Sequence, residues 1–271
     1  MNEFAEEKYM RLKEQMAVYA RQKILIAFSG GVDSSLLLAL AAEGAADRTG
    51  ITAVTMQTRL HPAAEIRHAE SVAAELHVRQ LTITVDELAE AGITDNPKDR
   101  CYRCKKYLFG KIRELAEETG AAYILEGTNA DDLHVYRPGI RAIRELGILS
   151  PLAGAGLTKD EVRSLAGRYG LSVAERPSMP CMATRFPYGV KLTRAALERA
   201  EEGEAYLRGL GFYNVRLRVH GETARIEVDQ TDFDAVVAGR DGIIRRMKEL
   251  GYRYVTLDLE GFRSGSMDAG L

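Results

Sequence analysis

The chain has 271 residues, 46% hydrophobic and 28% charged, which is typical of a soluble globular protein with room for two domains. Its net charge of −2 gives no global electrostatic reason to expect nucleic-acid binding. No apolar run approaches the roughly 20 residues of a membrane helix, and the charged N-terminus does not resemble a signal peptide. We therefore expect a cytoplasmic protein that binds neither membranes nor nucleic acids.

The first informative element is a strand, turn and helix unit. A strand of buried type at 24–28 runs into a glycine turn and then into an apolar helix. Backbone N–H groups and hydroxyls at the start of that helix would face phosphate oxygens, with the positive end of the helix dipole behind them. The residues at this position are Ser29, Gly30, Gly31, Asp33 and Ser34.

No Gly-Lys-Ser/Thr follows, so this turn is not the Walker loop. The run Ser-Gly-Gly-Val-Asp-Ser resembles instead the pyrophosphate loop of enzymes that cleave ATP between its α and β phosphates and adenylate a substrate. An ordinary strand-turn-helix joint is the alternative. The two glycines favour the pyrophosphate loop, because they let a ligand approach the backbone and tolerate positive φ.

Three further strand-like runs, at 51–57, 78–85 and 122–126, alternate with helical segments such as 63–76. This alternation predicts an α/β fold, with a parallel sheet and helices on both of its faces. Ligands of such sheets bind beyond the carboxyl ends of the strands. The pyrophosphate loop and the polar segment 126–132 would both fall there.

The second half of the chain has a different pattern. Thr158 and Glu161 have the spacing of a capping box, which predicts a helix over 158–169. The stretch 175–190 has no clear period, and we interpret it as an ordered loop or a domain crossing. A small α+β domain is predicted beyond it, because a helix, two strands, a helix and a strand follow in order. The domains we expect are 1–185 and 186–271, and the C-terminal elements are a helix at 193–210, strands at 215–219 and 224–228, a helix at 233–250 and a strand at 252–259.

The three cysteines, an odd number, argue against a disulfide framework. Cys101 and Cys104 have i, i+3 spacing, so on a helix both sulfurs would lie on the same side. Cys181 follows much later, and no histidine stands nearby to complete a zinc site. Three thiolates can hold three irons of a 4Fe-4S cluster and leave the fourth iron open for a ligand such as sulfide. A zinc site, a catalytic disulfide or three unrelated cysteines are the alternatives.

Several longer motifs accompany the pyrophosphate loop: YRPG at 136–139, RFPYG at 185–189, GF at 211–212, VRLRVH at 215–220, ARIE at 224–227 and the run at 251–265. With these motifs nearly the whole chain resembles the LarE family, sulfur transferases that mature the nickel-pincer nucleotide of lactate racemase. The C-terminal motifs are long, and they separate this family from other pyrophosphate-loop enzymes.

The resemblance implies a pyrophosphate-loop domain of the adenine nucleotide alpha hydrolase type, followed by a small α+β domain. It implies that ATP adenylates a carboxylate of pyridinium-3,5-dicarboxylic acid mononucleotide and that sulfur then displaces AMP to leave a thiocarboxylate. Adenylation is needed because a carboxylate is a poor electrophile at neutral pH. A sulfide or other sulfur donor and a homo-oligomeric assembly are further expectations.

The family has two ways of supplying sulfur. In one branch a single cysteine before the RFPYG motif gives up its own sulfur and becomes dehydroalanine, and Cys181 matches that position. The other branch uses three cysteines to bind a 4Fe-4S cluster that carries an extra sulfide. Because Cys101 and Cys104 are also present, we expect the cluster, and a catalytic rather than a sacrificial enzyme.

The resemblance also assigns roles around ATP and the acceptor. Asp33 would help to hold Mg²⁺ with the pyrophosphate, and Asn129 would lie near it on a strand-end loop where Asn and Asp also serve as turn residues. Arg137 and Arg185 would contact AMP or the acceptor.

Other roles fall on the C-terminal domain. Arg216 and Arg218 alternate along a strand and would clamp the substrate phosphate, with Arg263 near them; a solvated sheet face lined by arginines is the alternative. Glu204 and Glu227 match acidic residues implicated in cation binding, with plain surface charge as the alternative.

Three functions of other kinds remain open. A tRNA-thiolating enzyme can also combine a pyrophosphate loop with a three-cysteine cluster. An ammonia-using ligase of the NAD-synthetase or GMP-synthetase kind would leave the cysteines idle. A non-enzymatic ATP-binding regulator would release no pyrophosphate.

Overall fold

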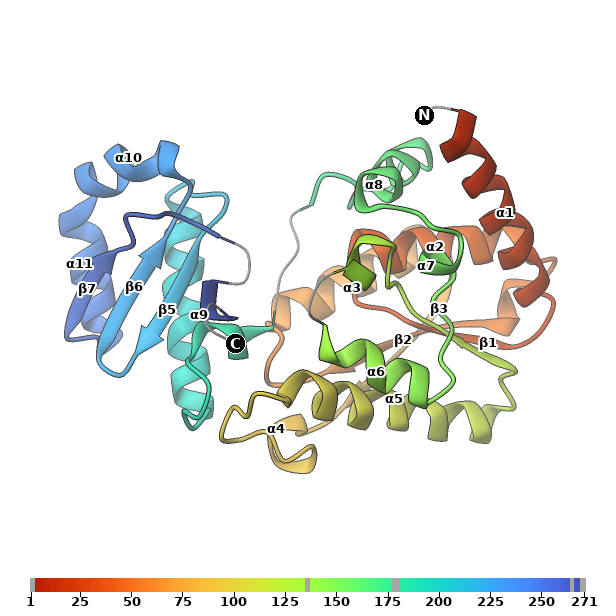
Figure 1. Ribbon diagram of the computed structural model, residues 1–271, viewed down its shortest axis with the longest axis horizontal. Helices are drawn as coiled ribbons and strands as arrows, with labels where there is room; N and C mark the ends of the chain where they lie inside the picture. The colour runs from red at the N-terminus through yellow and green to blue at the C-terminus, as the bar shows by residue number, and fades with distance from the viewer. Residues whose placement is uncertain (1–2, 135–136, 177–180, 264–265, 269–271) are drawn as a thin grey trace. The chain divides into compact units, whose positions relative to one another are not determined.

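A computed structural model describes residues 3–134, 137–176, 181–263 and 266–268. Position 136 of the YRPG motif, 177–180 of the expected loop and 264–265 of the last motif lie outside these residues. The chain forms two compact units (Figure 1). The first unit is Met1–Thr58, Ala63–Ile93 and Asp99–Ser178, and the second is Arg59–Pro62, Thr94–Lys98 and Met179–Leu271. The division at 178–179 lies a few residues before the expected boundary, and two short earlier segments join the second unit.

Strands and helices alternate along the first unit, as the sequence predicts. The strands are β1 (Ile24–Ala27), β2 (Ile51–Gln57), β3 (Arg79–Thr84) and β4 (Tyr123–Leu125). The helices are α1 (Glu3–Tyr19), α2 (Val32–Gly44), α3 (Ala63–Glu75), α4 (Glu87–Glu90), α5 (Arg100–Thr119), α6 (Pro138–Glu145), α7 (Pro151–Gly154) and α8 (Lys159–Arg168).

Within the described residues the strands form a four-stranded sheet in the order β3-β2-β1-β4, and every neighbouring pair is parallel. The predicted α/β fold with a parallel sheet is therefore confirmed. Since β1 is central, the pyrophosphate loop that follows it emerges between the carboxyl ends of β2 and β4, where ligands of such sheets bind.

Helices cover both faces of this sheet, with α1, α2 and α8 on one side and α5 and α6 on the other (Figure 1). Side chains of a strand point alternately to the two faces. Ile24 and Ile26 of β1 accordingly pack into a hydrophobic core with side chains of α1, α2 and α8. Leu25 packs on the other face, with Phe109 of α5 and Ile143 of α6. Burial on both faces explains why β1 is a continuous apolar run.

The predicted capping box at the start of α8 is present. The Thr158 hydroxyl accepts a hydrogen bond from the Glu161 N–H, and the Glu161 carboxylate accepts one from the Thr158 N–H at 2.8 Å. The cap fixes where α8 begins and therefore where its first residue, Lys159, is held.

The second unit is a small α+β domain, as predicted. Its elements are α9 (Arg194–Gly209), β5 (Arg216–His220), β6 (Thr223–Glu227), α10 (Phe233–Ala238), α11 (Arg240–Glu249) and β7 (Tyr254–Leu257). The strand order is β5-β6-β7, with β5 antiparallel and β7 parallel to β6. The prediction of a single helix over 233–250 is wrong. The helix is interrupted at Gly239, which is the C-cap of α10 and the N-cap of α11.

Helices α9 and α11 pack together on one face of the second sheet. A Cβ atom at Gly203 of α9 would lie 2.5 Å from Leu217 of β5 and 3.4 Å from Met247 of α11, so this glycine permits the close approach. Leu217 faces these helices, and the alternation of side chains sends its neighbours Arg216 and Arg218 to the opposite face.

The second unit also holds the RFPYG motif in place. Asn96, which is fully buried, donates hydrogen bonds from its side chain to the carbonyls of Phe186 (3.1 Å) and Pro187 (2.8 Å). The Met182 N–H donates to the Leu60 carbonyl at 2.9 Å.

None of the helices formed by the described residues is long and apolar enough to span a bilayer.

Candidate active site

The loop between β1 and α2 is organised by its own serines. The hydroxyls of Ser29 and Ser34 lie 3.3 Å apart, the Gly31 N–H donates to the Ser29 hydroxyl at 3.3 Å, and the Ser34 hydroxyl donates to the Gly31 carbonyl at 3.1 Å. The N-cap of α2 is Gly31, and no side chain among the described residues caps this helix end. The first N–H groups of α2 are therefore available to an anion.

The two glycines of the loop have different roles. Gly30 has a φ of +71°, and a Cβ atom there would lie 2.8 Å from the Cα of Ala69 in α3. Gly31 has an ordinary φ of −79°, and a Cβ atom there would meet only the Ser29 hydroxyl, at 3.3 Å. The backbone thus requires glycine at position 30, whereas at position 31 glycine keeps the approach to the loop open.

Asp33 lies on the first turn of α2, where three segments meet. The Asn129 side chain donates to one Asp33 oxygen at 3.1 Å, and the Lys159 ammonium forms an ion pair with the other. Asn129 is only 2% exposed, and Asp33 is 21% exposed. The pyrophosphate loop, the loop after β4 and the start of α8 are therefore joined through one carboxylate.

The loop after β4 extends this network of polar contacts around Asp33. Asn129 and Asp132 exchange hydrogen bonds of 3.2 Å between side chain and backbone N–H, which is a turn role for both. Asp132 also forms an ion pair with Arg137 at 2.9 Å, and Asp131 accepts the Lys159 N–H at 2.8 Å. The Arg137 side chain, which is 52% exposed, is thus held beside this network of polar contacts with its guanidinium accessible.

Sequence reasoning missed Lys159 and Gly127. A Cβ atom at Gly127 would lie 3.0 Å from both the Asp33 Cβ and the Ser34 N–H nitrogen, so only glycine allows this approach. One signal for Lys159 was present, since a lysine in the first turn of a helix opposes the helix dipole. The ion pair with Asp33 compensates for that unfavourable position.

Cys101 and Cys104 lie near the start of α5, the helical setting in which their i, i+3 spacing puts both sulfurs on the same side, with Cys101 exposed and Cys104 half-buried. The next residue, Lys105, packs over Gly139 of α6, where a Cβ atom would lie 2.5 Å from the lysine Cδ. The cysteine turn therefore neighbours the start of α6 and Arg137. Cys181 is half-buried in the second unit, and its carbonyl accepts the Thr184 hydroxyl at 2.8 Å.

Glu204 on α9 is the centre of a buried ion-pair group. Its carboxylate binds Arg185 through two hydrogen bonds of 2.7 and 2.8 Å, and Arg185 and Glu204 have no exposed surface. Glu204 also accepts the Leu217 N–H at 3.0 Å and a hydrogen bond from Arg208 at 3.2 Å. The surface-charge alternative for Glu204 is wrong, and the guanidinium of Arg185 is engaged with a carboxylate.

Glu227 of β6 organises a second group. It is fully buried and binds Arg218 at 2.8 Å and Arg225 at 3.0 Å, and it accepts the Ser266 hydroxyl at 2.8 Å. Glu227 is therefore not plain surface charge. Its carboxylate, like that of Glu204, is occupied by arginines, and no group of three His, Cys, Asp or Glu side chains suited to a metal ion exists among the described residues.

Arg216 differs from its neighbours because no carboxylate pairs with it among the described residues. It is 7% exposed, donates to the Val215 carbonyl at 2.8 Å and stacks on the Phe262 ring at 5.0 Å. Burial, and then the positive charge of Arg185, lower the pKa of Arg216 to about 10. Arg218 is 4% exposed, so the solvated-face alternative for this pair is wrong.

Arg263 is exposed, unlike the two strand arginines, and forms an ion pair with Glu260.

Comparison with known proteins identifies the family. The asparagine synthase family matches residues 11–148, which include the pyrophosphate loop and all four strands of the first sheet. A pyridinium-3,5-bisthiocarboxylic acid mononucleotide synthase of Lactiplantibacillus plantarum is 38% identical over 91% of this chain and 89% of its own length. The chain belongs to this family, the LarE synthases. It is an enzyme of the ATP-using pyrophosphate-loop kind.

Two other relatives give context. An uncharacterized protein of Synechocystis is 38% identical over 91% of this chain and 92% of its own length. A tRNA-specific 2-thiouridylase of Pelobacter propionicus is 33% identical over 57% of this chain and 52% of its own length. The LarE-family resemblance thus extends over the second unit, whereas the likeness to the thiouridylase covers little more than half of the chain.

Proposed function

We propose that this enzyme is an ATP-dependent sulfur transferase that adenylates a carboxylate of pyridinium-3,5-dicarboxylic acid mononucleotide and replaces AMP with sulfur. The observation that carries the proposal is the uncapped, serine-lined start of α2 beside Asp33 and Lys159. The name of the relative from L. plantarum supports the choice of acceptor.

In the first step a carboxylate oxygen of the acceptor attacks the α-phosphorus of ATP. The bond from that phosphorus to the bridging oxygen breaks, and pyrophosphate leaves with the electron pair. The N–H groups at the start of α2 and the hydroxyls of Ser29 and Ser34 would bind the leaving pyrophosphate. Lys159 would add a positive charge next to it.

Asp33 fits the expected Mg²⁺ position, because its carboxylate already binds a cation, the Lys159 ammonium. Carboxylate and phosphate oxygens are the ligands that Mg²⁺ prefers. When bound, the ion would neutralise charge on the pyrophosphate. Lys159 would then be released from Asp33 to contact a phosphate oxygen.

In the second step a sulfur nucleophile attacks the carbonyl carbon of the acyl adenylate. The carbon–oxygen bond to AMP breaks, AMP leaves with the electron pair, and a thiocarboxylate remains. Asn129, which binds Asp33, and Arg137, which binds Asp132 of the same loop, are our candidates for holding the adenylate in place.

We propose that Cys101, Cys104 and Cys181 hold a 4Fe-4S cluster. The position of Cys101 and Cys104 on one helical turn, with Cys101 exposed, supports two of the three ligands. Cys181 follows from the sequence pattern. When bound, the cluster would carry the sulfide on the iron that no cysteine ligates. The competing proposal is that Cys181 donates its own sulfur.

The arginines of β5 are our candidates for the phosphate of the mononucleotide. Arg216 supports this best, because its guanidinium is nearly buried without a carboxylate partner in the described chain. Arg218 and Arg263 would assist, although each has a carboxylate partner. For Arg185, Glu204 and Glu227 the buried ion pairs favour a structural role over contacts to nucleotide or cation.

The deciding experiment is anaerobic purification followed by iron and sulfide analysis and a visible spectrum. We expect a brown protein whose iron is lost in the separate alanine variants of Cys101, Cys104 and Cys181. Mass spectrometry after turnover provides the second readout. An iron-free protein in which Cys181 has lost hydrogen sulfide would contradict the cluster and support the sacrificial proposal.

A tRNA-thiolating enzyme is the second candidate, because the thiouridylase of P. propionicus matches part of the chain. A salt-sensitive shift of tRNA in a binding assay would favour it. We also propose a cytoplasmic location and a homo-oligomeric assembly, the latter to be measured by light scattering.

A further inference from the structure

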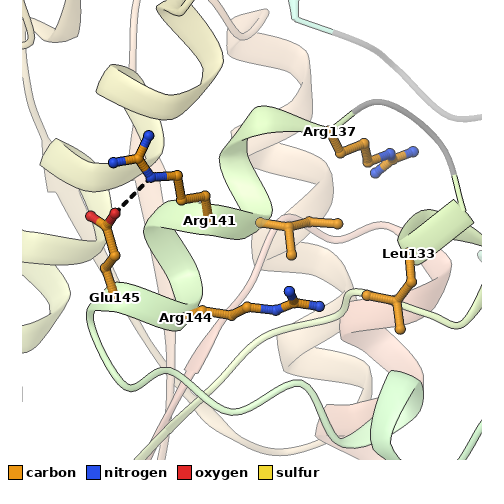
Figure 2. Close-up of a pocket in the computed structure, with 6 residues that line it drawn as sticks. Leu133, Arg137, Arg141, Arg144 and Glu145 are labelled. Carbon is orange, nitrogen blue, oxygen red and sulfur yellow. Dashed lines mark hydrogen bonds and ion pairs between the residues drawn. The ribbon is translucent and has the colours of Figure 1, made fainter.

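A hollow of 360 Å³ lies over α6 in the first unit (Figure 2). Its volume is within the range of small-molecule sites, about 300–1,000 Å³. The side chains that line it are mostly cationic or aliphatic: Leu133, Arg137, Ile140, Arg141, Arg144 and Glu145.

The arginines of the hollow occupy one face of α6. Arg137 is the N-cap of this helix, and Arg141 and Arg144 follow at four and seven residues, the spacing of one helical face. Ile140 lies between them on the same face. The hollow is therefore lined mainly by α6, and Leu133 of the short helical turn Asp131–His134 completes its lining.

The three guanidinium groups differ in what they bind. Arg137 pairs with Asp132 at 2.9 Å, and Arg141 pairs with Glu145 at 2.8 Å and stacks on the Tyr102 ring at 4.7 Å. The Arg144 guanidinium makes no hydrogen bond, ion pair or ring contact with any residue of the described chain.

Figure 2 shows where these side chains point. Arg137 and Arg144 extend toward the side where Leu133 lies, whereas Arg141 turns toward Glu145. Among the described residues, therefore, no group pairs with the positive charge of Arg144, and this charge lines the hollow.

The hollow adjoins the candidate active site through Arg137. This arginine binds Asp132, Asp132 binds Asn129, and Asn129 binds Asp33 of the pyrophosphate loop. A ligand in the hollow would therefore contact Arg137, which is linked through Asp132 and Asn129 to Asp33 of the loop proposed to bind ATP.

We propose that this hollow binds the dicarboxylate ring of the acceptor. Arg137 and Arg144 would each bind a carboxylate, and Leu133 and Ile140 would contact the flat ring. The Cα atoms of the two arginines are two helical turns apart, about 10 Å, a span that long side chains can close onto two carboxylates of one ring. A bare phosphate would make no use of the aliphatic side chains.

This inference rests on the proposed function, because that function supplies the dicarboxylate. The test uses the full-length protein and a simple probe, pyridine-3,5-dicarboxylate, with binding measured by calorimetry. We expect Arg144→Gln to weaken binding at least about tenfold, the loss typical of a charge-assisted hydrogen bond. The matched control is Arg113→Gln, which removes an exposed arginine of α5 outside the hollow and should leave binding unchanged.

Several outcomes would overturn the inference. They are no binding of the probe to the wild-type protein, equal binding by wild type and Arg144→Gln, or competition by inorganic phosphate or pyrophosphate as strong as that by the dicarboxylate. Strong competition by these anions would identify the hollow as a phosphate site instead.

Kinetics separates this inference from the proposed function. In an active enzyme, Arg144→Gln should raise the KM for the mononucleotide about tenfold while leaving the KM for ATP unchanged. An active enzyme with an unchanged mononucleotide KM would refute the inference and leave the function intact. Loss of probe binding in Arg144→Gln, with no thiocarboxylate formed even by the wild type, would refute the function and support the dicarboxylate site.

Discussion

Among single residues, Glu204 has the strongest predicted effect on stability. It is fully buried and binds Arg185 and Arg208, so Glu204→Gln would leave buried arginine charge uncompensated. We expect the free energy of unfolding to fall by about 3 kcal/mol or more. The control is Glu198→Gln on the same helix, where an exposed pair with Arg194 should contribute less than about 1 kcal/mol. Urea denaturation measures both, and equal losses would contradict the structural role.

The same carboxylate predicts a pH dependence of stability. Burial raises the pKa of Glu204, but the hydrogen bonds and charge of Arg185 outweigh burial, so this pKa lies below its ordinary value of 4.5. As pH falls below about 4.5, the unfolded chain therefore takes up this proton before the folded protein does. The contribution of Glu204 is present above that pH and is lost in acid. Urea denaturation between pH 3 and 6 should show a smaller acid loss for Glu204→Gln than for Glu198→Gln.

Lys159 is the residue whose importance for the reaction can be tested most directly. Lys159→Met should lower the rate of pyrophosphate release about 100-fold or more, because it removes a charge next to the leaving pyrophosphate. The matched control is Lys111→Met, an exposed lysine of α5 that pairs with Glu114. Wild-type rates in Lys159→Met would refute the role that we give this lysine. A thermal melt of each variant shows whether the fold is retained.

At the scale of elements, the turn from β1 to α2 predicts different effects for its two glycines. Gly30→Ala places a Cβ atom 2.8 Å from the Ala69 backbone at a φ of +71°, so it should destabilise the fold by at least about 1 kcal/mol. Gly31→Ala meets only a serine hydroxyl at 3.3 Å, so it should keep the fold and raise the KM for ATP. Thermal melts and pyrophosphate-release assays distinguish the two. Equal melting temperatures would contradict the assignment.

The sequence was sufficient to predict most elements, because their signals are local. The buried run of β1, the glycine turn after it and the capping box of Thr158 each lie within a few residues. The ion pair of Lys159 with Asp33 joins residues 126 positions apart, and no local pattern encodes such a contact. The pairing of Arg185 with Glu204 was missed for a similar reason, since it depends on how a loop packs against a helix. The family resemblance named both residues but not the bond between them.

At the scale of the whole molecule, the residues that we propose for the reaction are divided between the two units. The first unit contains the pyrophosphate loop, Cys101 and Cys104, and the second contains Cys181 and the arginines of β5. The chain passes into the second unit at 59–62 and 94–98 before it enters it finally at 179. The Leu60 and Asn96 contacts then fix the RFPYG loop that follows Cys181. The second unit is therefore completed only by segments that interrupt the first.

The number of products formed per chain decides between the two sulfur sources. With ATP, acceptor and sulfide in excess, a cluster-bearing enzyme regains its sulfide after each cycle, so we expect many thiocarboxylates per chain. A sacrificial Cys181 can supply only one sulfur, because the resulting dehydroalanine is not converted back. The Cys101→Ala variant tests the same point, since it removes a cluster ligand but leaves Cys181 intact. We expect its multiple turnover to be lost, and a Cys101→Ala variant that turns over like the wild type would exclude the three-cysteine cluster.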